Sequence, residues 1–377
     1  MVAGDGTVYV NTWRSPYRKG AKIPAGGFLV ALRDADGDGV AETIERFGED
    51  SGKSGAVGGT GIAIYKGYLY AETSGRIVRY PLTPGRLVPQ AAELDVIVDD
   101  LPMKGAHTMH AFAISRGGAL YVNSGSASNA CQLKDRARHS PGQDPCEELR
   151  LRAGLWKYDA SVTGQVFEQA GRYASGLRNS VALAAHPSGE VFAVQHGRDQ
   201  LHENWPERFD AMQGAELPAE AMYRVAQGAD YGWPYCYFDG RLGAYFLAPE
   251  YGGDGRKAGR CADKPRPVAS FPAHWAPDAL LFYTGAAFPD RYVNGAFIAF
   301  HGSWNRPVQQ GYNVIFVPMD GNGSPSGNTE IFADGFAGAV KTPEGAAHRP
   351  SGLAMGPDGA LYISDDQRGR IWRVTRR

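Results

Sequence analysis

The chain of 377 residues has no excess of charge of either sign, no long apolar run and few cysteines. Its formal net charge is −1, which argues against nucleic-acid binding, because nucleic-acid-binding domains usually carry a basic patch or stripe. No apolar run approaches the length that a membrane-spanning helix needs. Long amphipathic patterns are also scarce, and the best candidate for a helix is the short acidic segment 216–227.

The four cysteines form no Cys-x-x-Cys or Cys-x-x-Cys-His pattern, which disfavours zinc ribbons and covalent haem. They fall into two local pairs across polar loops rich in Gly and Pro, which predicts the disulfides Cys131–Cys146 and Cys236–Cys261. Four reduced, buried thiols are the alternative, but such loops offer a free thiol little burial. Disulfides indicate an oxidising compartment, so we expect a periplasmic or secreted protein. Met1 leads directly into the strand-like TVYVNT without a signal-peptide pattern, which we interpret as a mature or truncated chain.

Glycine and proline are abundant, with 50 and 24 residues, and one hairpin pattern recurs six times. In each copy a turn ending in Gly precedes an apolar and aromatic strand: DGTVYV, KGYLYA, GGALYV, SGEVFA, NGAFIA and DGALYI. Six such sheets predict an all-β fold, a six-bladed β-propeller, with a β-sandwich as the alternative. We expect one domain over residues 1–377 with long inserted loops, the longest at about 200–275. The first blade begins at its second strand, so either upstream residues are missing or the C-terminal segment closes the ring.

Polar residues gather at the strand ends that lie away from these turns. Two strands flank the turn 186–189, so antiparallel pairing places Arg178 and Asn179 beside the segment 197–199. Equivalent ends of other blades carry His107, His110, His301, Trp304, Arg306, His348 and Arg349. Such ends converge near the central channel of a propeller, which predicts a ligand at the mouth of that channel.

Arginine recurs at these ends, at positions 178, 198, 306 and 349. Because Arg binds carboxylates in a bidentate way, several Arg side chains on one channel predict a polyanionic ligand. The alternative is that each Arg pairs with a local acidic side chain.

Five segments in order resemble the glucose/sorbosone dehydrogenase family, and the resemblance is closer to the sorbosone dehydrogenase branch. They are GLRN…HPSGEVF…HGRD, DYGWPYCY, FPAHWAP…LLFY, FIAFHGSWNRP…GYNVIFVP and HRPSGLAMGPDGALYISDD. Members of this family are six-bladed propellers that bind pyrroloquinoline quinone (PQQ) and Ca²⁺. The resemblance covers nearly the whole chain.

The resemblance implies a role for each matching residue. His107 is the general base that takes the proton of the sugar hydroxyl, with His110 as the second candidate. Arg178 and Asn179 lie beside the reacting carbonyl of the cofactor, where Arg178 stabilises negative charge on oxygen. The backbone carbonyls of Gly197 and Arg198 bind the Ca²⁺ that bridges to PQQ.

Other cofactor contacts depart from the family pattern. Arg349 corresponds to the Arg over the cofactor plane. A second family Arg, two residues later, is replaced by Ser351. A family Lys falls near residues 303–304, so Trp304 and Arg306 are the candidates to replace it.

A separate signal is the segment DADGDGVAETIE, residues 34–45, which matches the twelve-residue EF-hand loop. A second Ca²⁺ held by Asp34, Asp36, Asp38 and the carbonyl of Val40 is one interpretation, and a solvated hairpin loop is the other. Glu45 falls in the next expected strand.

The sequence therefore predicts a PQQ- and Ca²⁺-dependent dehydrogenase that oxidises a sugar or a related aldehyde or alcohol. Its expected partners are a small-molecule sugar and a separate electron acceptor of the cytochrome c or quinone type. A lactonase-type hydrolase on a six-bladed propeller is one alternative, but it needs Glu, Asn and Asp metal ligands facing the channel. A non-catalytic binding propeller is the other.

Overall fold

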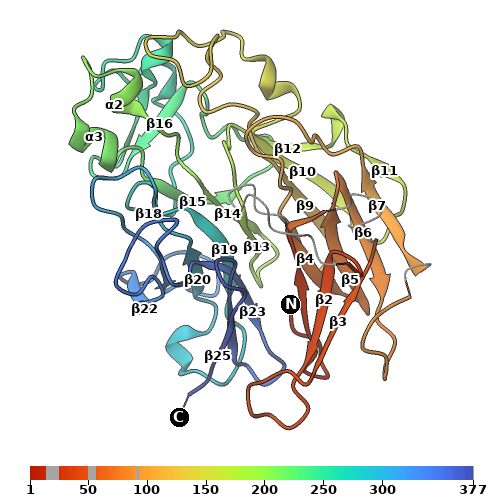
Figure 1. Cartoon of the computed structure of the whole chain (residues 1–377). Coiled ribbons are helices and arrows are strands. Elements are labelled where there is room, and N and C mark those ends of the chain that lie inside the picture. Colours follow the sequence, from red (N-terminus) through yellow and green to blue (C-terminus); the bar gives the residue numbers. More distant parts are fainter. Residues whose placement is uncertain (14–24, 50–56, 91–92, 377) are drawn as a thin grey trace.

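The computed structural model describes residues 1–13, 25–49, 57–90 and 93–376, and it confirms a six-bladed β-propeller (Figure 1). Blade 1 consists of β1 (Val8–Asn11), β2 (Leu29–Arg33) and β3 (Thr43–Phe47). Blade 2 consists of β4 (Gly58–Tyr65), β5 (Tyr68–Thr73), β6 (Arg76–Pro81) and β7 (Asp95–Asp99). Blade 3 consists of β8 (Phe112–Ile114), β9 (Ala119–Ser124), β10 (Gly154–Asp159) and β12 (Arg172–Ser175). Blade 4 consists of β13 (Ala182–Ala185), β14 (Val191–Gln195), β15 (Glu220–Val225) and β18 (Ala269–Phe271). Blade 5 consists of β19 (Pro277–Phe282), β20 (Ala296–Phe300), β21 (Asn313–Val317) and β22 (Glu330–Ala333). Blade 6 consists of β23 (Pro350–Met355), β24 (Leu361–Asp365) and β25 (Ile371–Val374). The short β11 (Gln165–Val166) adds to the edge of blade 2. The first strands β4, β8, β13, β19 and β23 contact one another in this order around the channel.

β1 takes the second place in blade 1, as the repeat predicts. Val2 forms a bridge with Val8, and the amide of Tyr9 donates to the carbonyl of Met1 at 2.7 Å. Residues 1–3 therefore take the innermost place, and β1, which follows the turn at Gly6, is the next strand out.

Most of the glycines that end the six repeated turns are required by the backbone conformation. Those at 6, 67, 118, 189 and 359 have φ between 78° and 98°, where glycine avoids the strain of other residues. Gly295 serves packing instead, since a Cβ there would lie 2.3 Å from the ring of Phe316.

Polar side chains at the ends of the second strands connect neighbouring blades on the side of the predicted site. The bonds are Asn11 Nδ2 to the Gly61 carbonyl (2.8 Å), the His110 amide to Glu72 Oε1 (2.6 Å) and the Ser180 amide to Asn123 Oδ1 (3.1 Å). These bonds fix the entry to the first strands of blades 2, 3 and 4, where the predicted site residues lie.

The prediction of a helix at 216–227 is wrong, because β15 occupies the middle half of that segment. Alternate residues of β15 pack into different apolar clusters, with Tyr223 in one and Met222 in the other. Burial on both faces of a central strand outweighs the local helical tendency. The neighbouring helix α3 (Ala211–Glu216) is short and starts at a capping box formed by Asp210 and Gln213.

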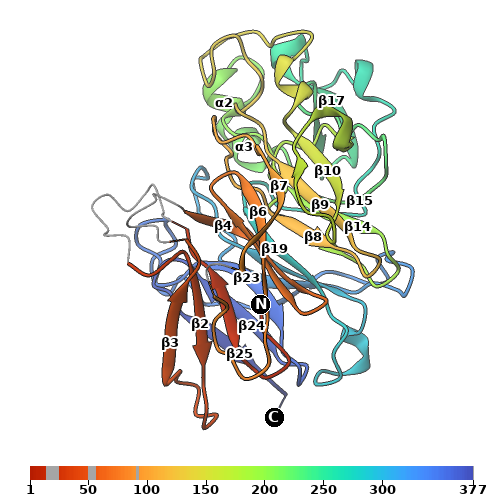
Figure 2. The same ribbon diagram turned by 90° about the vertical axis from the view of Figure 1, so that its right-hand side faces the viewer.

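The range 200–275, expected as one insertion, contains β15 and β18 of blade 4. The inserted parts are therefore two: one carries α2 (Leu201–Asn204) and α3, and the other carries the hairpin of β16 (Cys236–Asp239) and β17 (Ala244–Leu247). Short 3₁₀ helices are η2 (Glu147–Arg150), η3 (Gln169–Gly171), η4 (Pro249–Tyr251), η5 (Gly259–Cys261) and η6 (Asp290–Tyr292). Figures 1 and 2 both place α2, α3 and the inserted hairpin at the end of the molecule opposite the C-terminus.

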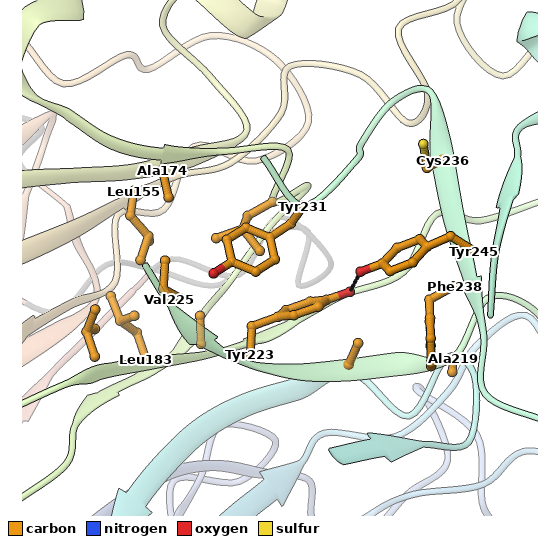
Figure 3. Packing of buried hydrophobic residues seen from close by; sticks show 14 of the residues in the cluster. Leu155, Ala174, Leu183, Ala219, Tyr223, Val225, Tyr231, Cys236, Phe238 and Tyr245 are labelled. Atoms are coloured by element: carbon orange, nitrogen blue, oxygen red, sulfur yellow. Dashed lines mark hydrogen bonds between the residues drawn. The ribbon is translucent and has the colours of Figure 1, made fainter. Parts of the chain in front are cut away.

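An apolar cluster holds the inserted hairpin against blades 3 and 4 (Figure 3). Tyr223 of β15 and Tyr245 of β17 share a hydrogen bond of 2.8 Å between their hydroxyl groups. Both predicted disulfides, Cys131–Cys146 and Cys236–Cys261, are confirmed. In the described part of the chain, no helix is long and apolar enough to cross a membrane.

Candidate functional site

The two open ends of the β13–β14 hairpin meet, as the antiparallel pairing predicts. Arg178, which precedes β13, donates from Nη1 to the carbonyl of Gly197 at 2.8 Å and from Nη2 to Asp199 at 3.1 Å. The amide of His196 also donates to the carbonyl of Asn179 at 2.9 Å. Arg178 is only 3% exposed, so its guanidinium is held in one place by the chain around it.

Asn129 supplies two further hydrogen-bond acceptors for this guanidinium. Arg178 donates from Nε to the backbone carbonyl of Asn129 and from Nη2 to its side-chain oxygen, both at 3.1 Å. The same side-chain oxygen accepts from the amide of Asp199 at 2.9 Å. Asn129 was not predicted from the sequence, because it follows no repeated pattern.

Asp199 is the centre of a charged network. Its carboxylate accepts from Arg178, from Arg136 Nη2 at 3.1 Å and from Asn305 Nδ2 at 2.9 Å. Burial alone would raise the pKa of Asp199, but Arg178, His274 and Arg136 lower it to about 2. Both guanidiniums bind this one carboxylate, and Arg136 also lies 3.9 Å from the carboxylate of Asp135.

Arg136 is a site residue that the sequence reasoning missed. It lies inside the loop closed by the Cys131–Cys146 disulfide and also donates to Gln200 at 2.8 Å. Its signal was a basic stretch, KDRARH, within a loop tied by a predicted disulfide.

His107 is a half-buried residue whose tautomer the structure defines. Its Nδ1 lies 2.8 Å from the carbonyl oxygen of Ser126, which can only accept, so Nδ1 carries the proton. Nε2 then has a free lone pair and no partner within the described ranges. Burial and then the charge of Arg178 hold the pKa of His107 well below its usual range, which keeps the ring neutral.

Asn179 lies next to His107. A Cβ on Gly125 would lie 2.6 Å from the Cβ of His107 and 2.7 Å from Oδ1 of Asn179, so only glycine permits this approach. Asn123 donates to that Oδ1 at 3.1 Å and so orients the amide. The structure thus brings together His107, Arg178 and Asn179, the three predicted catalytic residues.

His110 has a different environment. It is fully buried, and its two ring nitrogens lie 2.9 Å and 3.1 Å from the carbonyls of Asn123 and Pro102. Burial lowers the pKa of His110 to about 4. Its ring therefore packs between blades, whereas the ring of His107 keeps an open nitrogen.

Histidines and aspartates of blades 4 to 6 form a chain that begins at His196, next to Gly197. Asp278 lies 3.4 Å from His196 and 3.5 Å from His301, and His301 lies 2.9 Å from Asp366. Burial would lower the pKa of His196, but Asp278 raises it above its usual value. Sequence reasoning did not single out Asp278, which is an ordinary position at the start of a strand.

The four predicted arginines differ in their partners. Arg178 pairs with Asp199, Arg198 with Glu250 at 2.6 Å, and Arg306 with Glu216, so three follow the alternative of local pairing. Arg349 donates instead to the carbonyls of His301 and Gly302, both at 3.0 Å, and lies over the ring of Tyr312. Its backbone amide donates to Asp365, but its guanidinium makes no carboxylate hydrogen bond within the described ranges.

The acidic loop before β3 is far from this network in the sequence. Asp34, Asp36 and Asp38 lie with Glu42 so that one carboxylate oxygen of each is within 4.8 Å of the others, and all four are exposed. Glu45 is part of β3. Calcium binding by this loop stays a prediction.

The propeller and its polar channel end define the class of protein, and comparison with known proteins defines the family. Residues 31–377 match the TrAA12-like family, and the chain belongs to that family. Two solved structures show the same fold. A family AA12 protein of Trichoderma reesei has 20% identity and a TM-score of 0.70, covering 98% of this chain and 96% of that chain. The PQQ domain of pyranose dehydrogenase from Coprinopsis cinerea, in its holo form, has 18% identity and a TM-score of 0.72, covering 100% and 91%.

Two curated relatives match about half of the chain. A PQQ-dependent pyranose dehydrogenase of Coprinopsis cinerea is 26% identical over 239 residues, which is 53% of this chain and 31% of that protein. An uncharacterized protein of Borreliella burgdorferi is 31% identical over 202 residues, which is 53% and 48%. The aligned part thus spans less than half of either relative.

Proposed function

We propose that this protein is a PQQ- and Ca²⁺-dependent dehydrogenase that oxidises a sugar or a related aldehyde or alcohol. The observation that carries the proposal is a neutral His107 with an open Nε2, held beside Arg178 and Asn179. The family and the PQQ-dependent relatives support the cofactor, and the closer likeness to sorbosone dehydrogenases stays a prediction.

The charges at the site fit an anionic cofactor. Arg178 and Arg136 both bind the Asp199 carboxylate, whereas the Arg349 guanidinium donates to backbone carbonyls within the described ranges, so it is the guanidinium left to bind a carboxylate of a ligand. Arg178, Asn179 and Arg349 would hold PQQ, which supplies an ortho-quinone that accepts hydride. Contacts from Trp304 and Arg306 were also predicted, but the guanidinium of Arg306 already binds Glu216 and two backbone carbonyls.

Two residues of the chain would carry out the proton transfer and the charge stabilisation. Nε2 of His107 accepts the proton of the substrate hydroxyl, and the bond from Nδ1 to Ser126 keeps the required tautomer. Arg178 stabilises the negative charge that develops on oxygen, because it is buried and already oriented.

The calcium site would use two consecutive backbone carbonyls. The Gly197 oxygen accepts one hydrogen bond from Arg178, and a carbonyl oxygen has a second lone pair. The Arg198 oxygen has no donor within the described ranges. Hard oxygen ligands of this kind suit Ca²⁺.

The alternatives lack a comparable observation. A lactonase-type hydrolase needs a cluster of side-chain metal ligands at the channel, but within the described residues the cluster found is the exposed one at Asp34–Glu42. A binding propeller without catalysis would not need an unpaired nitrogen on His107. The electron acceptor is a separate protein or quinone, and the disulfides favour a periplasmic or secreted protein.

Titration calorimetry with PQQ, with and without a calcium chelator, tests the cofactor. Binding should require Ca²⁺, and a panel of sugars should then bleach an electron-acceptor dye. Equal binding with chelator would refute the calcium bridge, and absence of turnover with every sugar would refute the dehydrogenase.

A further inference from the structure

The carbonyl oxygen of Arg198, one of the two proposed calcium ligands, is directed by the peptide group to which it belongs. The amide of Asp199, in the same trans peptide group, donates to Asn129 Oδ1 at 2.9 Å. Asn129 also donates from Nδ2 to the carbonyl of Asp199 at 2.9 Å. Because a trans peptide group is planar, its C=O points away from its N–H, so the Arg198 oxygen points away from Asn129.

The side chain of Arg198 is held separately from this peptide group. Its Nη1 donates to both carboxylate oxygens of Glu250 at 2.6 Å, and its Nε donates to the carbonyl of Asp199 at 3.1 Å. The side chains of Arg198 and Glu250 are 4% and 0% exposed. The guanidinium therefore has one defined position, away from water.

Glu250 is itself anchored from two sides. Trp205 donates from Nε1 to Glu250 Oε1 at 2.9 Å, and the amide of Gly142 donates to the backbone carbonyl of Glu250 at 3.0 Å. Glu250 lies in η4, Trp205 directly follows α2, and Gly142 belongs to the loop between β9 and β10. Three loops outside the blades therefore meet at Glu250, which makes its carboxylate a fixed point.

A buried ion pair of this kind contributes direction more than stability. The cost of removing both charges from water offsets much of their attraction, and an apolar pair of similar size is often as stable. Two short bonds from one guanidinium nitrogen to both oxygens of a carboxylate, however, define where the guanidinium lies. The pair of Arg198 and Glu250 thus fixes the place of the Arg198 side chain on the loop.

The bonds of Asn129 fix one end of the peptide group, at Asp199, and the ion pair fixes the other end, at the Cα of Arg198. We propose that Glu250 is a positioning residue for the calcium site, which holds the carbonyl of Arg198 in place through the Arg198 side chain. This inference rests on the proposed calcium ligands Gly197 and Arg198. It gives the insertion that carries β16, β17 and η4 a function in metal binding, although it lies outside the six blades.

Calorimetric titration of CaCl₂ into the full chain in the presence of PQQ tests the role of Glu250. Glu250→Gln keeps the size of the side chain but removes one of the two oxygens that hold Arg198. It should weaken calcium binding by about 10–100-fold, the usual effect of losing the partner of a metal ligand. Glu216→Gln is the matched control, because it removes the carboxylate partner of another buried arginine, Arg306, and should leave the calcium affinity unchanged.

A double variant separates positioning from stability. Arg198→Met with Glu250→Leu replaces the ion pair by apolar side chains, so the melting temperature should stay near that of the wild type. Its calcium affinity should still fall, because nothing then ties the side chain at position 198 to a fixed point. Hydrogen exchange of the metal-free protein, which needs no cofactor, should become faster in residues 196–200 and stay unchanged in the blades.

Wild-type calcium affinity in both Glu250→Gln and the double variant would overturn the inference and leave the proposed function standing. An equal loss of affinity in Glu216→Gln would also overturn it. So would faster exchange throughout the blades with a lower melting temperature, because the pair would then serve stability alone. If the wild-type protein with PQQ binds no Ca²⁺, the calcium site of the proposed function fails, and this inference fails with it.

Discussion

The guanidinium of Arg178 donates a hydrogen bond of 2.8 Å to the carbonyl oxygen of Gly197. The two residues are at the two open ends of the β13–β14 hairpin, and antiparallel pairing brings them together. One is the proposed stabiliser of negative charge and the other a proposed calcium ligand. Calcium bound at Gly197 would therefore be coupled to the position of Arg178 through one carbonyl.

Replacing His107 by Ala should remove turnover while the fold and PQQ binding persist. Loss of a general base costs about 10²–10⁴-fold in rate, and the loss should appear in kcat more than in KM. His110→Ala is the control: its ring is fully buried and packs against the carbonyls of Asn123 and Pro102, so that change should lower the melting temperature. An inactive, stable His110→Ala beside an active His107→Ala would reverse the assignment.

The acid limb of kcat/KM should lie below the usual His range of about 6.5, since burial and Arg178 hold the pKa of His107 down. A lowered pKa keeps the base neutral in mild acid, so activity falls only as the pH drops through the lowered value. If His196 were the base, the acid limb of kcat/KM would lie above about 6.5, because Asp278 raises the pKa of His196. A pH profile of kcat/KM decides, and a limb above 6.5 contradicts the role of His107.

Asp199→Asn should destabilise the protein by about 3–5 kcal/mol, because Arg178 and Arg136 would lose a buried carboxylate. Urea unfolding measures this. The matched control is Asp95→Asn, which removes a more exposed partner of Arg79 and should cost less than about 1 kcal/mol.

The same variant should also change the acid dependence of stability. The pKa of Asp199 is about 2 in the fold, below its unfolded value, so its contribution is present above the unfolded value and is lost as pH falls toward 2. Asp199→Asn should show less acid destabilisation than the wild type. An unchanged pH profile of stability would contradict the network.

Replacing both Cys131 and Cys146 by Ser should lower the free energy of unfolding by about 3 kcal/mol and also reduce PQQ affinity, because Arg136 lies in that loop. The pair Cys236–Cys261 is the comparison: its loop carries Glu250, the partner of Arg198, but no side chain that binds Asp199, so its loss should lower stability with a smaller effect on PQQ binding. Equal effects on PQQ affinity would argue against a role for Arg136.

The sequence was sufficient for the fold, the two disulfides and the meeting of Arg178 with Gly197–Asp199. Each of these follows from local rules: a repeated Gly turn, short spacing between cysteines, and antiparallel pairing across one hairpin. The trio His107, Arg178 and Asn179 was named through the family resemblance, and the structure adds the tautomer that leaves Nε2 open.

The tertiary structure alone decided which polar side chains meet across blades. Arg136 and Asn305 reach Asp199 from positions 63 and 106 residues away, and Arg198 and Arg306 turn to Glu250 and Glu216. The helix expected at 216–227 became β15 for the same reason. Partners and burial at these positions depend on contacts between distant segments, and those contacts leave no periodic signal in the chain.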